Sequence, residues 1–175
     1  MKATQIRKKA VVSIAEAEKV GTINDLILNP DKHHVEAFWV KTEPEGIMKV
    51  VPTDAAQNLG RDALTIRDRK ALQDEYAAKG KETVRLDKLQ GSKVITHSGT
   101  LVGTVSEVEV DPSNFEIVGY EVNTGGLPGL VGAGRRKLSP NVNFGEDILM
   151  IPDSARIEPS GKEEHRKTER GKKAA

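Results

Sequence analysis

Histidines are the first residues in this sequence whose side chains could do chemistry. The chain has four, and only His33 and His34 are adjacent, while His97 and His165 stand alone. A metal site needs three or four ligands that converge on one point, and two neighbours in a turn point in different directions. His97 precedes Ser98 in another predicted turn, which is no support for a Ser/His/Asp arrangement. We therefore expect exposed histidines without a metal, a cofactor or a catalytic role.

Glycines and cations gather between residues 125 and 137, where a phosphate could be cradled by glycine backbone and basic side chains. The stretch lacks the Gly-Lys-Ser/Thr ending of a P-loop, and no long helix is predicted to follow it. We predict a loop between strands whose apolar residues form an exposed finger, which suits a protein partner better than a nucleotide. Its candidate contact residues are Leu127, Leu130, Val131, Arg135, Arg136 and Lys137.

Trp39 is the only tryptophan of the chain and the first residue to test for partner binding. Because side chains alternate along a strand, Phe38 and Val40 share one face and Trp39 points to the opposite one. Tryptophan is enriched at the centres of interfaces. We expect Trp39 to be covered by the other half of the chain, by a linker or by another chain, including a second copy of this protein. Ordinary packing on both faces of the strand is the alternative.

An internal repeat supplies the elements that position these residues. Residues 19–30 match residues 101–112 at a constant shift of 82, and residues 60–68 match residues 145–153 at a shift of 85. Alternating charged and apolar residues in each copy predict half-buried antiparallel strands. Asn-Pro and Asp-Pro turns join these strands. A Val-Gly-Thr sequence opens each hairpin, and its glycine predicts a bulge or a sharp bend.

This repeated pattern resembles the PRC-barrel module. The resemblance rests on Gly-Thr followed by an apolar residue and, later, an acidic one, a strand ending in Asn-Pro or Asp-Pro, and a final Leu-x-Ile strand. It implies a mainly β protein made of two small barrels in tandem. The module occurs in the cytoplasmic part of the photosynthetic reaction centre H subunit and in a ribosome maturation factor. No catalytic residues come with the family.

The predicted organisation is barrel repeat 1 over residues 6–68, a helical linker over 69–89, barrel repeat 2 over 90–158 and a disordered basic tail over 159–175. In the linker, leucine and tyrosine four residues apart indicate one apolar helix face. The tail carries six cations and three carboxylates, a net charge of +3, so the rest of the chain sums to −2 because the whole chain has +1.

The composition of the chain excludes several classes of functional site. The chain has no cysteine, which excludes disulfides, thiolate metal sites and a cysteine nucleophile. It also lacks the run of about 20 apolar residues that spans a bilayer. We expect a cytoplasmic, non-enzymatic protein-interaction or scaffolding module without a cofactor. The alternatives are an RNA- or ribosome-associated factor that uses the basic tail, and an assembly protein similar to the reaction centre H subunit.

Overall fold

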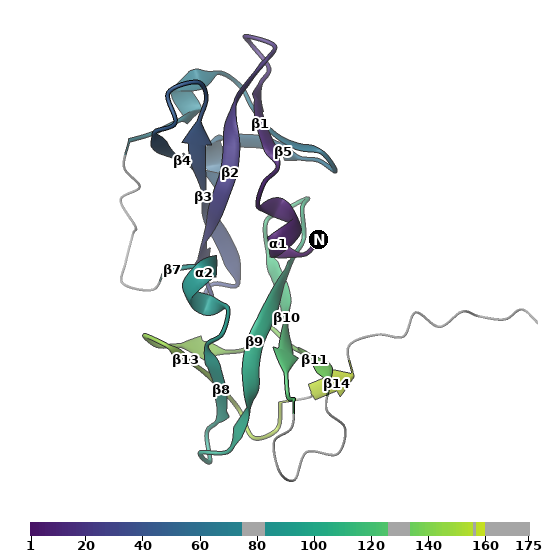
Figure 1. Cartoon of the computed structure of the whole chain (residues 1–175). Coiled ribbons are helices and arrows are strands. Elements are labelled where there is room, and N and C mark those ends of the chain that lie inside the picture. Colours follow the sequence, from purple (N-terminus) through teal and green to yellow (C-terminus); the bar gives the residue numbers. More distant parts are fainter. Residues whose placement is uncertain (75–82, 126–133, 156, 160–175) are drawn as a thin grey trace, which may run out of the picture.

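A computed structural model of the 175-residue chain describes residues 1–74, 83–125, 134–155 and 157–159. The predicted tail lies outside these residues except for its first position. Leu127, Leu130 and Val131 also lie outside them, and only the backbone of Arg135 and Arg136 is described. The fold is mainly β, as predicted, with two curled sheets arranged end to end (Figure 1).

The first sheet has the strand order β4-β3-β2-β1-β6-β5. Strands β1 and β6 pair in parallel, and the other neighbours are antiparallel. Strand β7 (Val84–Arg85), which lies within the predicted linker, also pairs with β2. The elements of this repeat are α1 (Ala3–Ile6), β1 (Ala10–Ser13), β2 (Glu18–Asn29), β3 (His34–Thr42), β4 (Met48–Pro52), η1 (Thr53–Ala55), β5 (Ala56–Leu59), β6 (Ala63–Ile66) and η2 (Arg69–Ala71).

The second sheet has the order β12-β13-β8-β9-β10-β11-β14, and its one parallel pair, β8 with β13, corresponds to β1 with β6. The elements of the second repeat are β7 (Val84–Arg85), which joins the first sheet, α2 (Leu86–Leu89), β8 (Lys93–Thr96), β9 (Leu101–Val110), β10 (Ile117–Asn123), β11 (Arg135–Leu138), β12 (Asn143–Phe144), β13 (Ile148–Ile151) and β14 (Ile157–Pro159).

The described part of the predicted helical linker contains two single helical turns, η2 and α2. The 3-10 turn η2 is followed by extended backbone at Leu72, and Gln73 then forms a β-bridge with Val50. Residues 75–82 lie outside the described part of the chain. The one-turn helix α2 follows them. A bridge at Gln73 competes with helix formation because the same backbone groups cannot serve both.

The duplication extends to the irregularities of the strands. Three β-bulges interrupt the pairing of β2 with β1 and β3, and three bulges interrupt the pairing of β9 with β8 and β10. The unpaired residues of the two sets differ by 82 in number. They are Val20, Asn24 and Glu36 in the first repeat and Val102, Ser106 and Val118 in the second. Because each bulge bends its strand, both sheets curl in the same way.

Gly21 and Gly103, the glycines of the two Val-Gly-Thr sequences, lie where one strand approaches another closely. A Cβ atom at Gly21 would be 2.5 Å from the carbonyl oxygen of Lys41, and one at Gly103 would be 2.3 Å from that of Asn123. Since these contacts are with backbone atoms, no side-chain movement relieves them. Each glycine also follows a bulge, which agrees with the bend predicted from sequence.

The two sheets share one continuous hydrophobic core. It contains buried residues of both repeats, including Phe38 and Tyr120, which are 0% and 1% exposed. Phe38 packs edge-on against Phe115 of the second repeat, with ring centroids 5.6 Å apart. Within the described residues, no helix is long and apolar enough to cross a membrane.

Candidate functional site

The hairpin turns of the two repeats meet in a reciprocal contact. The amide of Val35 donates to the carbonyl oxygen of Phe115 at 2.9 Å, and the amide of Ile117 donates to that of His33 at 2.7 Å. The two bonds are equivalent, because the two donors differ by 82 in residue number and so do the two acceptors. Between them, His34 and Glu116 form an isolated β-bridge, and they too differ by 82. The repeats are therefore related by a pseudo-twofold axis at this bridge, and we call equivalent residues sisters.

Each repeat also begins with a short arm that packs on the other repeat. The first arm, residues 1–9, pairs with β9: Met1 exchanges two backbone hydrogen bonds with Val110, at 2.7 and 2.8 Å. The second arm, residues 84–92, pairs with β2 through β7. Both arms contain one helical turn followed by a residue with positive φ, Lys8 at 72° and Gly91 at 86°. The arms are thus exchanged between the repeats.

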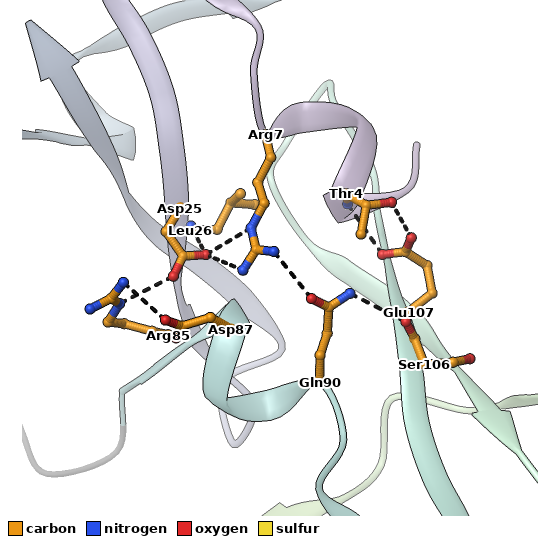
Figure 2. A network of polar contacts seen from close by, with 9 residues as sticks. All are labelled: Thr4, Arg7, Asp25, Leu26, Arg85, Asp87, Gln90, Ser106 and Glu107. Atoms are coloured by element: carbon orange, nitrogen blue, oxygen red, sulfur yellow. Dashed lines mark hydrogen bonds and ion pairs between the residues drawn. The ribbon is translucent and has the colours of Figure 1, made fainter.

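Asp25 on β2 lies where both arms meet (Figure 2). Its side chain is 1% exposed and accepts hydrogen bonds from Arg7 of the first arm, at 2.8 and 3.1 Å, and from Arg85 of the second arm, at 3.1 Å. The amide of Leu26 donates to the same carboxylate at 2.9 Å. A buried carboxylate requires such partners, because an unpaired charge in this position is costly. Asp25 therefore ties both arms to the first repeat.

Glu107, the sister of Asp25, occupies the same position on β9 and is also buried. It accepts hydrogen bonds from the hydroxyl and amide of Thr4 in the first arm and from the amide of Val108. Gln90 connects the two halves of the network in Figure 2: its carbonyl accepts from Arg7 at 3.2 Å and its amide donates to the Ser106 carbonyl at 3.2 Å. This arrangement holds the repeats together.

The outer face of the first sheet carries a second, smaller apolar cluster, which we call the Trp39 patch. Trp39 packs over three buried residues, Ile27, Ala37 and Val50. The guanidinium of Arg85 lies 4.7 Å from the centroid of the indole ring. Arg85 comes from the predicted linker, so residues of that segment do lie over the ring. The indole Nε1 is buried and has no hydrogen-bond acceptor among the described residues.

The sister face of the second sheet has the opposite chemistry. At these positions it carries ionic side chains and one glycine. Lys137 pairs with Glu109 at 3.0 Å, and Glu109 raises the pKa of Lys137 by accepting its hydrogen bond. Lys2, the sister of Arg85, pairs with Glu121, the sister of Trp39, at 3.1 Å. The four positions are Ile27, Ala37, Trp39 and Val50 in one repeat and Glu109, Gly119, Glu121 and Lys137 in the other.

A groove, which we call the α2 groove, adjoins the Trp39 patch. Its larger hollow, of about 840 Å³, is lined by Arg85 and Lys88 of the second arm and by residues 144–147. A second hollow, of about 330 Å³, continues it as far as Lys93 and shares Lys88 and Asp147 with the first. Arg85 belongs to both the Trp39 patch and the groove. The two surfaces are therefore continuous.

The structure brings two of the histidines together. His33 and His97 line one hollow of about 570 Å³ with Asp31, although they are far apart in sequence. No three metal-ligating side chains converge anywhere in the described residues. The Nε2 atom of His34 lies 3.1 Å from the Asn114 carbonyl oxygen, while His165 falls outside the described part.

Of the predicted contact residues, Trp39 and Lys137 have described side chains, and they lie on sister faces. Sequence reasoning missed the two arms and the buried pair Asp25 and Glu107. One signal was present: both copies place an acidic residue, Asp25 or Glu107, at the same position of the repeat. The sequence did not indicate which residues bind Asp25, because its partners Arg7 and Arg85 are 78 residues apart in the chain.

A protein-family model, the PRC-barrel domain, matches the chain twice, over residues 1–73 and 81–156. These two matches include both arms with their own repeats. No curated protein gives a match.

Proposed function

The chain belongs to the PRC-barrel family, with two copies of the domain, and on this premise we propose that it is a protein-interaction module whose two barrels act as one body. Since fold alone does not define function, the proposal rests on a surface. That surface is the Trp39 patch.

The proposal depends on the difference between the Trp39 patch and the equivalent face of the second repeat. The second repeat builds the same curled sheet with charged side chains where the first has the Trp39 patch. The barrel therefore does not need apolar residues at these positions for its own stability. Tryptophan and arginine are the side chains most enriched in interface hot spots. A partner that covers Trp39 and Arg85 accounts for the difference between the two faces.

The described surface gives little support to nucleic-acid binding, the first alternative. Binding to phosphates requires a set of cations that are free to contact them. Many described cations instead pair with carboxylates. These pairs are Lys2 with Glu121, Lys19 with Glu43, Lys49 with Asp74, Arg69 with Glu18 and Lys137 with Glu109.

We propose a cytoplasmic setting, a protein partner and no catalytic activity for this module. The polar groups buried between the repeats, Asp25 and Glu107, are bound by residues of the arms and serve assembly. The reaction-centre-like alternative differs in one observable respect, since it requires the partner to be in a membrane fraction.

Substitution of Trp39 by glutamate tests the proposal. Trp39→Glu places a carboxylate beside Arg85, as in the Lys2–Glu121 pair, so we expect the protein to fold. Capture of its partner by the tagged full-length chain should fall by about tenfold or more, the usual effect of losing a hot spot. The measurement is quantitative mass spectrometry of captured proteins, with and without nuclease, from soluble and membrane fractions.

Ile14→Glu is the matched control, because Ile14 is 58% exposed and lies away from the patch, in the turn between β1 and β2. This variant should capture the partner as the unmodified chain does. Equal capture by a folded Trp39→Glu variant would contradict the proposal, and complete loss of partners after nuclease treatment would favour the RNA alternative.

A further inference from the structure

We propose that the partner binds as an extended segment along the α2 groove, and that this segment carries an acidic residue close to a basic one. The inference rests on the proposed function, which it extends from a patch to a binding mode.

The position of Arg85 provides the first argument. Its guanidinium lies over Trp39 and also lines the larger hollow of the groove. A chain that covers the Trp39 patch therefore reaches the groove without leaving the protein surface. The groove continues along α2 to Lys93, which suits a segment of several residues rather than a small molecule.

The lining of the groove carries charges of both signs. Lys88 lies on the α2 side, whereas Glu146 and Asp147 lie on the turn between β12 and β13. Lys88 and Asp147 line both hollows, yet none of these three groups has an ion-pair partner among the described residues. The larger hollow is also lined by Val84, which is buried, and Phe144, which is half-buried. The groove thus combines apolar side chains with charged groups of both signs that a partner could contact.

Charge complementarity identifies the occupant. In an extended peptide, successive side chains point to opposite sides. A carboxylate of such a segment would pair with Lys88 or Lys93, and a nearby cation would pair with Glu146 or Asp147. A uniformly acidic or uniformly basic segment would meet repulsion from the groups of its own sign.

The sister surface lacks this chemistry. The sister of Lys88 is the neutral Gln5, and the sister of Glu146 is the cation Arg61. The α2 groove is lined by residues of the second repeat, and it meets the Trp39 patch of the first repeat at Arg85, because the second arm packs on the first repeat. One chain accordingly presents one such groove, not two.

Photo-cross-linking in the full-length chain tests the inference. A p-benzoylphenylalanine probe replaces Lys88 or Asp147 in the groove and, as matched controls, Gln5 or Asp62 at the exposed sister positions. We expect cross-links to the captured partner from the two groove positions at least about fivefold above those from the controls. Sequencing of the cross-linked peptide by mass spectrometry should show an acidic and a basic residue within a few positions of each other.

Charge reversal supplies a second readout. Lys88→Glu should weaken capture of the same partner about fivefold, the effect of losing one exposed ion pair, and Lys88→Arg should preserve it. Cross-links that are equal at groove and sister positions, or a cross-linked segment of one charge sign only, would overturn the inference. If capture depends on Trp39 while the groove positions give no cross-link, the inference is wrong and the proposed function stands. If capture does not depend on Trp39, the proposed function itself fails.

Discussion

At the scale of single residues, two buried carboxylates at sister positions determine how the chain is assembled. Asp25 and Glu107 each follow a bulge and accept the amide of the next residue. Their remaining hydrogen-bonding capacity is met by the arms. Arg7 and Arg85 bind Asp25, and Thr4 binds Glu107. Burial of a carboxylate thus makes each arm a requirement of the fold.

Asp25→Ala should lower the free energy of unfolding by about 3 kcal/mol, because it leaves Arg7 without its partner in a largely buried position. Arg85→Ala should cost less, about 1 kcal/mol, since Arg85 is more exposed than Arg7 and Arg7 still binds Asp25 in this variant. Urea unfolding followed by circular dichroism measures both values. A smaller loss for Asp25→Ala than for Arg85→Ala would contradict the assignment of Asp25 as the joint anchor.

Tyr120 is a second residue with a measurable signature. Burial raises the pKa of its phenol, with a further contribution from Asp31, and its hydroxyl has no hydrogen-bond partner in the described residues. The unfolded chain releases this proton near pH 10 whereas the folded chain keeps it, so the stability supplied by Tyr120 is lost as pH rises above about 10.

Tyr120→Phe, which installs the residue found at the sister position Phe38, should leave stability at pH 7 unchanged or raise it by about 1 kcal/mol. The advantage of the variant should grow above pH 10. Unfolding measured at pH 7, 10 and 11 checks this, and a constant difference between the two proteins would show that Tyr120 ionises normally in the folded state.

At the scale of elements, the strands are bent at fixed places and therefore cross closely. Bulges at equivalent positions curl both sheets, and Gly21 and Gly103 occupy the points where a neighbouring backbone leaves no room for a Cβ atom. The Val-Gly-Thr motif is thus a packing requirement of the barrel in both copies.

Gly21→Ala and Gly103→Ala should each destabilise the protein by about 2 kcal/mol, the typical cost of forcing an atom into packed structure. Gly60→Ala is the control, because its nearest neighbour would lie 3.4 Å away, at the Ala63 carbonyl oxygen. Thermal unfolding compares the three variants. Similar midpoints for all of them would show that the strand crossing adjusts without cost.

At the scale of the whole molecule, the two repeats form a covalently joined pseudo-dimer. One core runs through both, the hairpin turns bond reciprocally, and the arms are exchanged. Each arm packs on the other repeat as well as on its own, so neither repeat has its complete set of partners alone. This explains why a binding surface can combine residues of both repeats.

Cleavage of the connection between the repeats should therefore leave them associated. With a specific protease site inserted between residues 78 and 79, we expect both fragments to co-elute from a sizing column in 1:1 ratio after cleavage. Asp25→Ala in the same background should promote their separation. Separation of the unmodified fragments would contradict a shared core.

The sequence determined the local features of this protein. Period-two alternation, proline turns and the duplicated Val-Gly-Thr motif specified a mainly β fold in two copies, because strand pairing and bulges depend on neighbouring residues. The repeat also aligns Phe38 with Tyr120 at the shift of 82, and the structure buries both side chains.

Only the tertiary structure decided which residues of one copy complete the other. Asp25 obtains its partners from Arg7 and Arg85, and the Trp39 patch continues into a groove built by the second repeat, although these residues are distant along the chain. The sequence pattern of one copy is the same whether its arm packs on its own repeat or on the other repeat. The physical reason is that burial of charge and apolar surface is satisfied in space, where residues of both arms bind Asp25 and a residue of the first arm binds Glu107.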